Sequence, residues 1–458
     1  MSPKNWVPEV RETDLPRYVG IAEAIGADIA SGRLNPGDRL PPQRQIAGVL
    51  GVDISAISRG YAEAARRGYV QAHVGRGTFV LDPREGKPSA DPRRTSEEDS
   101  RMNMPPEPQD PKLIARMQAG LSHVAANIVP LLRYQTPLGG DKDREIAGKW
   151  LHANGLSFVS DRFAVAPGAH AAIDAALTVL RQPGTVVLCE QVTYPGIRAI
   201  AARLGLELVE VEEDEHGIAP AALEAAIARY PATVLYLNPT LRNPTTHTIP
   251  AQRRSEISRV LRAHNTPLIE DDAYRFVAAD APAPICDSLP DLGWHIAGIS
   301  KVFGAGLRLA YVQVPNAPFL VPFVKAVRAA HVMTSPISLA LLSTWIEDGT
   351  AAQVQDFVRK AARERQQIAK DTLINISFDS NPDAFNIWLT LPNGLNRAEA
   401  LARLFGRQIG ILPSDFFIPN GAGEDKLRIC LGGPISLESL RKELQQVQYA
   451  LSAPDWSG

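Results

Sequence analysis

Residues 300–308 of this chain read Ser-Lys-Val-Phe-Gly-Ala-Gly-Leu-Arg, directly after an apolar run from Trp294 to Ile299. A lysine becomes a nucleophile toward carbonyl compounds when its surroundings lower its pKa. Arg308 lies seven residues after Lys301 and carries a guanidinium fork that matches a phosphate group. By itself the segment is more typical of an ordinary surface turn. The rest of the chain reverses that interpretation.

On both sides of this segment, apolar runs alternate with helical stretches. The runs expected to form strands are 163–165, 185–189, 233–237, 267–269, 295–297 and 309–312, and helices are expected at 171–180, 219–228 and 253–263. Nearly continuous apolar strands separated by helices indicate a buried, mainly parallel α/β sheet. Ligands of such sheets bind in the loops beyond the carboxyl ends of the strands.

Polar clusters follow several of these strands. Gly168, Ala169 and His170 pass from a strand into a helix, whose first amide groups can bind a phosphate. Tyr194 can place its ring over a flat ligand, although a core tyrosine is equally consistent with its position. The segment 238–245 offers a side-chain amide in a rigid, proline-containing turn.

A run of three carboxylates, Glu270, Asp271 and Asp272, closes another strand and precedes Tyr274. Like charges this close resist joint burial unless a cation is near, so metal binding is a fair alternative at this point. The carboxylates, the aromatic ring and the phosphate-binding loop could all contact a ligand that is bound to Lys301.

In the order and spacing of these motifs, residues 112–445 resemble the fold type I aminotransferases, which carry pyridoxal 5′-phosphate. The resemblance implies a large, mainly parallel sheet domain and a smaller C-terminal α+β domain. It implies that Lys301 forms the Schiff base with the cofactor and that Asp271 faces the pyridine nitrogen. Asn243 and Tyr274 match the pair that hydrogen-bonds the phenolic oxygen of the ring. Lys301, Asp271 and Tyr274 are the implied catalytic groups.

The same resemblance supplies the remaining contacts. Tyr194 matches the aromatic residue that stacks on the ring, and Tyr134 matches a tyrosine that reaches the phosphate of the neighbouring subunit. Arg428, together with Asn243, matches the residues that bind the α-carboxylate of the substrate. The counterparts of the phosphate-binding residues are Gly168, Ala169, His170, Ser300 and Arg308.

Two positions depart from the family pattern. Thr246 stands where the family usually has glycine, and Gly298 stands where it has Ser or Thr, which removes one hydroxyl contact to the phosphate. Neither change removes a group that the Schiff base needs. We therefore expect the cofactor to bind, whereas efficient turnover stays open.

The first eighty residues follow a different pattern. Apolar residues recur at helical spacing over 18–29. A second, short helix is expected after Pro42, carrying Ile46, Val49 and Leu50. Two helices joined by a tight glycine turn make a helix-turn-helix.

Asp53 can cap the third helix, whose buried face would be Ile57, Tyr61 and Ala64. Residues 69–80 then alternate around a glycine-containing turn, which predicts a short hairpin, or wing.

Residues 32–80 resemble the winged helix-turn-helix of the GntR family of bacterial regulators from end to end. In that family the second helix of the motif enters the major groove and the wing approaches the minor groove. The residues implied to face DNA are Arg44, Ser55, Ser58 and Arg59 on the helices and Gly75, Arg76 and Gly77 at the wing. Family members often carry a basic residue where Ile54 stands here. A helix-turn-helix can also bind proteins, but the wing and the extended match favour DNA.

Whole-chain properties narrow the possibilities further. The 458 residues are 45% hydrophobic and 21% charged with a net charge of −2, so any DNA-binding face must be local. Residues 1–80 contain ten Lys or Arg and eight Asp or Glu, a net charge of only +2. Cys189, Cys286 and Cys430 are too widely spaced for a metal or redox motif. With no apolar run of eighteen residues and no signal peptide, a soluble cytoplasmic protein that does not bind membranes is expected.

Residues 81–111 are rich in Pro, Ser and charge, which predicts a flexible tether, or alternatively a loop lying on the next domain. The expected domains are therefore 1–80, this connector, and 112–458. A GntR-type domain, a tether and an aminotransferase-like domain in this order resemble the MocR subfamily of regulators. That resemblance implies a homodimer that binds double-stranded operator DNA and senses an amino-acid-like effector through pyridoxal phosphate. The main alternative is a working amino-acid aminotransferase, and a regulator that has lost the cofactor is disfavoured because the ring-binding residues are present.

Overall fold

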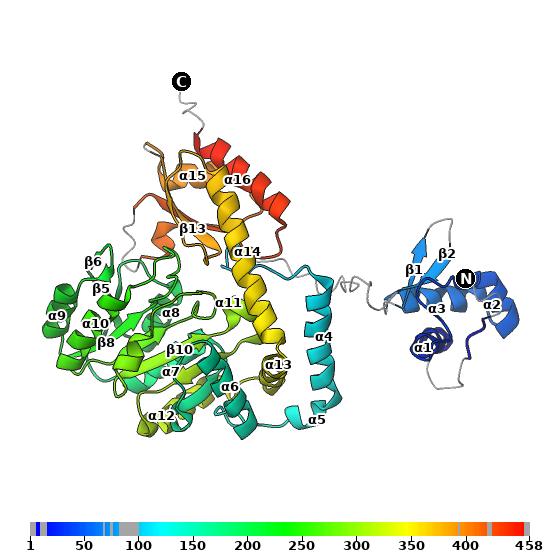
Figure 1. The fold of residues 1–458 in the computed structure, drawn as a ribbon, viewed down its shortest axis with the longest axis horizontal. Coiled ribbons are helices and arrows are strands. Elements are labelled where there is room, and N and C mark those ends of the chain that lie inside the picture. The colour runs from blue at the N-terminus through cyan, green and yellow to red at the C-terminus, as the bar shows by residue number, and fades with distance from the viewer. Residues whose placement is uncertain are drawn as a thin grey trace. The chain divides into compact units, whose positions relative to one another are not determined.

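The computed structural model describes residues 6–9, 16–66, 69–73, 77–81, 100–392, 394–418 and 424–452. The chain divides into two compact units, Met1–Glu98 and Asp99–Gly458 (Figure 1). Residues 100–110, which fall inside the expected tether, belong to the larger unit.

The smaller unit consists of three helices and a hairpin, as expected. Its elements are α1 (Arg17–Ala30), α2 (Gln43–Leu50), α3 (Ile54–Arg66), β1 (Val70–His73) and β2 (Gly77–Val80). Helix α2 begins after Pro42 and ends at Gly51, whose φ of 60° lies in the left-handed region that favours glycine. Asp53 caps α3 by accepting the amide hydrogen of Ser55 at 2.7 Å.

The core of this unit lies between α1 and α3. Ile57, Tyr61 and Ala64 are buried, as their spacing predicted. Gly60 allows close packing, since a Cβ there would lie 2.7 Å from the Cγ2 atom of Ile21. Val49 differs from the expectation: it is 59% exposed, because α2 buries Ile46 and Ala47 on its other face.

A seven-stranded sheet forms the centre of the larger unit. Its strands are β3 (Phe163–Ala166), β4 (Thr185–Glu190), β5 (Glu207–Val211), β8 (Ala232–Leu237), β9 (Leu268–Asp271), β10 (Gly293–Gly298) and β11 (Ala310–Gln313), in the order β3-β11-β10-β9-β8-β4-β5. Only β11 runs antiparallel to its neighbours β10 and β3, so the mainly parallel sheet is confirmed. A short pair, β6 (Glu213–Asp214) and β7 (Gly217–Ile218), lies outside it.

Helices cover the sheet and complete the larger unit. They are α4 (Pro111–Ala126), α5 (Ile128–Leu131), α6 (Asp141–Ala153), α7 (Ala169–Leu180), α8 (Pro195–Leu204), α9 (Pro220–Arg229), α10 (Ala251–Ala263), α11 (Ser300–Phe303), α12 (Ala317–His331) and α13 (Pro336–Glu347). The three helices predicted between strands appear as α7, α9 and α10. One apolar core joins α7, α8 and α12 to the strands, and a second joins α9 and α10 to them.

A smaller antiparallel sheet forms the C-terminal part, as predicted. Its strands are β12 (Phe378–Asp379), β13 (Asn386–Thr390), β15 (Lys426–Cys430) and β14 (Ile411–Pro413), in that order. The long helix α14 (Thr350–Thr372) connects the core around the large sheet to this small sheet (Figure 1). Helices α15 (Arg397–Arg403) and α16 (Leu437–Ser452) pack on the small sheet.

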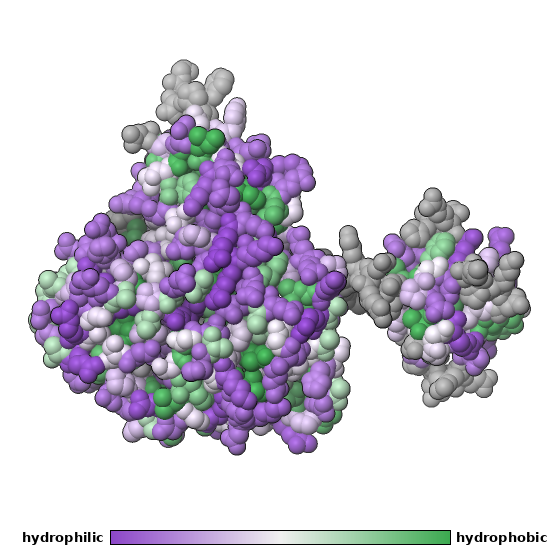
Figure 2. Space-filling model, viewed as in Figure 1, coloured by the Kyte–Doolittle hydropathy of each residue, from purple (hydrophilic) through white to green (hydrophobic). Residues whose placement is uncertain are grey.

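Hydrophilic residues cover much of the visible face of the larger unit (Figure 2). In the described part of the chain, no helix combines the length and the apolar character needed to cross a membrane.

Candidate functional site

The parallel strands place the sequence motifs at one edge of the large sheet. Asp271 ends β9, and Tyr274 follows it by three residues. Strand β10 ends at Gly298, and Lys301 lies in the short helix α11 just beyond. Because the carboxyl ends of adjacent parallel strands meet at the same edge, these side chains converge there.

Lys301 is half-buried, and its amino group is held by the backbone. Its Nζ atom donates a hydrogen bond to the carbonyl oxygen of Asn103 at 2.6 Å and lies 5.6 Å from the centroid of the Tyr274 ring. Burial lowers the pKa of Lys301 to about 8, and the positive charge of Arg428 acts in the same direction. Roughly a tenth of the amine is therefore neutral at pH 7, far more than in an ordinary lysine, and the neutral form is the nucleophile.

Asp271 is buried, and one of its carboxylate oxygens is unpaired. Tyr236 donates its hydroxyl hydrogen to the Oδ2 atom at 2.8 Å, and Asn238 holds the backbone carbonyl at 2.6 Å. The Oδ1 atom is buried without a hydrogen-bond partner among the described residues. Burial raises the pKa of Asp271 to about 6. A buried acceptor without a partner among the described residues is free to accept a hydrogen bond from a bound ligand.

The two neighbouring carboxylates have other partners. Glu270 accepts the amide hydrogens of Ile285 and Cys286 and pairs with Arg254. Asp272 lies 3.2 Å from the Nε2 atom of His295. In the described ranges, no three His, Cys, Asp or Glu side chains come together as metal ligands would.

Arg428 on β15 faces the same site from the small sheet. Its Nη1 atom donates to the Oδ1 atom of Asn243 at 3.0 Å, and its Nη2 atom donates to the carbonyl oxygen of Arg101. The Phe417 ring lies 5.1 Å from the guanidinium carbon. The guanidinium is thus fixed in one orientation, and its buried Nε atom has no hydrogen-bond partner in the part of the chain that the structure describes. Such a fork suits a carboxylate.

Tyr274 and Asn243 complete this wall of the site. Asn103 donates a hydrogen bond from its Nδ2 atom to the Tyr274 hydroxyl at 2.9 Å. Burial raises the pKa of Tyr274, so its hydroxyl stays protonated. The backbone amide of Asn243 donates to the side chain of Asn238 at 3.1 Å, which fixes the loop that carries it.

The expected phosphate-binding residues gather at the start of α7. Gly168 has a φ of 95°, and a Cβ there would lie 3.1 Å from the Nη2 atom of Arg308. Arg308 therefore lies against the backbone that enters α7, where amide groups point outward. The predicted residues at this position are Gly168, Ala169, His170 and Arg308, while Ser300 begins α11 after β10, which β11 separates from β3 in the sheet.

Tyr194 and His170 lie beside each other at this end of the site. The Nδ1 atom of His170 is 3.3 Å from the Tyr194 hydroxyl, and the two rings meet edge to face. Burial lowers the pKa of His170. Tyr134 is not part of this cluster: its side chain is 86% exposed on the loop after α5.

Sequence reasoning missed the residues that hold the site in place. Tyr236 lies inside an apolar strand and resembles a core residue, and Asn103 lies in the segment expected to be a tether. Asn103 also donates to Asn386 at 2.9 Å, whose own amide donates to the carbonyl of Pro244 at 2.7 Å. No local sequence pattern distinguishes such residues.

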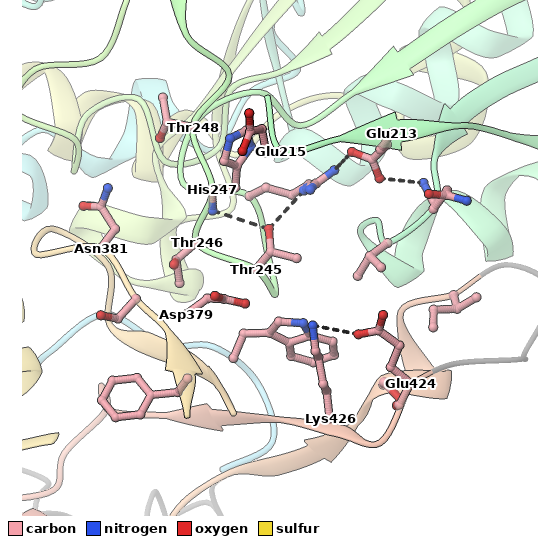
Figure 3. A pocket seen from close by; sticks show the side chains of 18 of the residues that line it. Glu213, Glu215, Thr245, Thr246, His247, Thr248, Asp379, Asn381, Glu424 and Lys426 are labelled. Carbon is pink, nitrogen blue, oxygen red and sulfur yellow. Dashed lines mark hydrogen bonds and ion pairs between the residues drawn. The ribbon is translucent and has the colours of Figure 1, made fainter. Parts of the chain in front are cut away.

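A large cleft adjoins this site. It has a volume of about 1180 Å³ and lies between residues 242–248 and the small sheet. Figure 3 shows side chains of that loop facing Lys426 across the cleft, with Lys426 paired to Glu424 at 2.7 Å. Lys426 precedes Arg428 by two residues on β15, whereas Lys301 does not line the cleft.

The expected DNA-facing residues lie on the surface of the smaller unit. The side chains of Arg44, Ser55, Ser58 and Arg59 are exposed on α2 and α3. Gly77 begins β2 with a φ of 111°, which a wing turn requires of glycine. Gly75 and Arg76 fall outside the described residues.

Comparison with known proteins agrees with both parts of the chain. The model of aminotransferase class I and II matches residues 103–442. The chain belongs to this family. Residues 17–80 match the model of bacterial regulatory proteins of the gntR family. The combination of the two is the architecture of the MocR subfamily, so the resemblance read from the sequence is confirmed.

Several relatives that match three quarters or more of the chain are transcriptional regulators. An uncharacterised HTH-type regulator of Bacillus subtilis, YdeF, is 27% identical over 98% of this chain and 97% of its own. The pyridoxine biosynthesis regulator PdxR of Corynebacterium glutamicum is 26% identical over 77% of this chain and 78% of its own. The crystal structure of the α-aminoadipate aminotransferase LysN of Thermus thermophilus covers 76% of this chain and 90% of its own, with a TM-score of 0.67 at 22% identity. This last match shows the fold.

The chain is therefore a transcriptional regulator of the GntR/MocR type with an aminotransferase-like domain.

Proposed function

We propose that this regulator binds pyridoxal 5′-phosphate through Lys301 and senses an amino compound that carries a carboxylate. The observation that carries the proposal is the unpaired Oδ1 atom of Asp271, buried in the site that Lys301 and Arg428 face. A protonated ring nitrogen is the donor that such an atom needs.

The other residues fit the cofactor equally well. Tyr236 would keep Asp271 aimed at the ring nitrogen, and Tyr274 with Asn243 would serve the phenolic oxygen. The start of α7 with Arg308, His170 and Ser300 would hold the phosphate, and Tyr194 would lie against the ring. When bound, the cofactor supplies an electron-withdrawing ring and a carbonyl that an amine can attack.

The residues also define the class of effector. The neutral amine of Lys301 serves the carbonyl chemistry, and Arg428 offers a bidentate site for a carboxylate. An α-amino acid, or a compound with the same two groups, matches both.

Two features support operator binding by a dimer. Arg44, Ser55, Ser58 and Arg59 form an exposed polar face on the helix-turn-helix, as DNA contact requires. Tyr134 is an aromatic side chain with 86% exposure, which suits a residue that reaches the phosphate of a partner subunit. A symmetric dimer would present two DNA-binding heads to paired half-sites.

A working aminotransferase is the second candidate, favoured by the partly neutral Lys301 next to Asp271 and Arg428. Complete turnover of an amino acid with a keto acid, together with no shift of promoter DNA, would favour the enzyme over the regulator.

Absorbance tests the cofactor proposal directly. The purified protein with pyridoxal phosphate should show the visible band of a lysine-bound cofactor, and Lys301→Ala should lose it. Lys426→Ala is the matched control, since this lysine lines the neighbouring cleft and should leave the band unchanged. A band that persists in Lys301→Ala would overturn the proposal.

A further inference from the structure

Residues 100–106, which we call the strap, pack closely against glycines beside the small sheet. A Cβ on Gly432 would lie 1.9 Å from the carbonyl oxygen of Met104, and a Cβ on Gly410 would lie 1.7 Å from that of Ser100. The amide of Gly433 donates to the carbonyl of Pro105 at 3.1 Å. Glycine is needed at both contact points because any side chain would collide with the strap backbone.

The middle of the strap occupies two groups that the proposed function assigns to ligands. The carbonyl oxygen of Asn103 accepts a hydrogen bond from the Nζ atom of Lys301 at 2.6 Å. The carbonyl oxygen of Arg101 accepts one from the Nη2 atom of Arg428. Two carbonyls, two residues apart, therefore hold the lysine and the carboxylate-binding arginine together.

The side chain of Asn103 fastens the strap from within the site. Asn103 is 3% exposed, and its Nδ2 atom donates to the Tyr274 hydroxyl and to Asn386, both at 2.9 Å. Its Oδ1 atom is buried with no partner among the described residues. The strap is therefore part of the site, and an unused acceptor faces this buried interior.

We propose that residues 101–103 act as an internal ligand: capture of the cofactor takes Lys301 from the Asn103 carbonyl, and an amino compound with a carboxylate then displaces the Arg101 carbonyl from Arg428. The inference rests on the proposed function above and adds the means by which the site is coupled to the rest of the chain. Residues 82–99 join the strap directly to the DNA-binding unit, so release of the strap acts on the connection between the two units.

The strength of the competing contacts favours displacement by a carboxylate. The Arg101 carbonyl is neutral and accepts from one guanidinium nitrogen, whereas a carboxylate is charged and accepts from two. The bond to the Arg101 carbonyl is single and charged on the arginine side alone, whereas a carboxylate adds a second charge and a second, parallel hydrogen bond. An amine without a carboxylate leaves the bond between Arg101 and Arg428 intact. Release of the strap therefore selects amino acids over simple amines.

Release also changes the reach of the connector. Freeing residues 100–103 adds up to four residues of extended chain, roughly 13 Å at about 3.3 Å per residue. The local concentration of a tethered DNA-binding unit at its half-site depends on that reach. An effector can thus change operator occupancy without any change inside either folded unit.

Trypsin reports strap release directly, because it cleaves the peptide bond after Arg101 and the carbonyl of that bond is the one held by Arg428. The full-length protein is digested briefly, and cleavage after Arg101 is compared by mass spectrometry with cleavage after Arg93 and Arg94. The ligands are N-(5′-phosphopyridoxyl)-L-alanine and pyridoxamine 5′-phosphate, which differ in the carboxylate-bearing arm. The alanine adduct should speed cleavage after Arg101 roughly ten- to a hundredfold over pyridoxamine phosphate, as expected for loss of a hydrogen bond to a charged group.

Two variants test the strap without any ligand. In Gly432→Ala the new methyl group would collide with the Met104 carbonyl of the strap, and Arg428→Gln removes the guanidinium that donates to the Arg101 carbonyl. Each variant should therefore show rapid cleavage after Arg101 with no ligand present. Gly48→Ala is the control, because a Cβ there meets no atom within 4 Å. Circular dichroism verifies that each variant is folded.

Three results separate the two proposals. If the adduct binds, as tryptophan fluorescence reports, but cleavage after Arg101 stays at the unliganded rate, the strap inference is overturned. Wild-type cleavage rates in both folded variants overturn it as well. If neither ligand binds, the proposed cofactor site fails, and the two variants still decide the strap.

Discussion

Lys301 and Asn103 lie 198 positions apart in the chain, yet the Nζ atom of Lys301 donates to the Asn103 carbonyl oxygen at 2.6 Å. This contact joins the proposed cofactor lysine to the segment that leads to the DNA-binding unit. The lysine is therefore engaged before any ligand arrives, and cofactor capture must first release it.

The pKa of Lys301 predicts how cofactor capture depends on pH. Burial lowers this pKa to about 8, and only the neutral amine attacks a carbonyl. Below about pH 8 the neutral fraction falls about tenfold per pH unit. The rate at which visible absorbance develops on mixing the cofactor-free protein with pyridoxal phosphate should rise with pH and level off above about pH 8. A rate independent of pH through this range would contradict the assignment.

Arg428→Gln should move that profile. The positive charge of Arg428 helps to lower the pKa of Lys301, so its removal raises the pKa toward the usual value of 10.5. The pH at which the capture rate levels off should therefore increase. Arg428→Lys keeps the charge and serves as the control in the same rapid-mixing experiment.

Asp271→Asn should affect stability and cofactor retention in opposite directions. The folded pKa of Asp271 is about 6, above the ordinary value of 3.8, so ionisation of this buried carboxylate costs stability. The cost begins as pH rises past about 4 and is complete above about 6, where it reaches up to roughly 3 kcal/mol. The variant should therefore gain relative stability over that interval while it loses affinity for pyridoxal phosphate.

Urea denaturation of the full chain at pH values below and above this interval measures the effect. Tryptophan fluorescence suits it, since five of the six tryptophans lie between residues 150 and 456. A stability difference between wild type and Asp271→Asn that does not change with pH would argue against a raised pKa.

Tyr236→Phe should destabilise the protein by removing the hydrogen bond to the other oxygen of the Asp271 carboxylate. It removes the donor at 2.8 Å and leaves both Asp271 oxygens without a side-chain partner. An unsatisfied buried acceptor costs about 1–3 kcal/mol, so the free energy of unfolding should fall by that amount above about pH 6. Equal stability of Tyr236→Phe and wild type would mean that Asp271 finds another donor.

DNA binding should respond to Arg59→Ala through salt dependence. Arg59 is exposed on α3, and loss of one phosphate contact lowers the slope of log affinity against log salt by about 0.9. Arg33→Ala is the control, because Arg33 pairs with Glu9 and Asp28 within 3.4 Å. Binding of a DNA fragment selected by the protein from a random pool, measured at several salt concentrations, tests this. Identical slopes for both variants and wild type would remove Arg59 from the interface.

The sequence predicted the strands and helices well where one apolar pattern sufficed. Strands β4 and β10 are buried along their whole length, so their composition carries a clear signal. Val49 shows the limit of the helical pattern, since a helix of only eight residues buries just two of them, and periodicity alone does not select which.

Sequence patterns indicate the candidate site only where side chains would carry its chemistry. Lys301, Asp271 and Arg428 belong to motifs with recognisable spacing. The strap holds them through the carbonyl groups of Arg101 and Asn103, which every residue possesses, so no side-chain pattern marks it. Its proline-rich composition is also that of a connector.

Strand β15 carries Arg428, and the chain reaches Gly432, on which the strap lies, only four residues later. The residue that would detect an effector therefore lies within four residues of the surface that the strap contacts. Communication between effector and operator then needs no relay through the protein interior. Effector binding at Arg428 and release of the strap at Gly432 would then depend on neighbouring positions. Substitutions at a few residues around them could change the strength of the response during evolution.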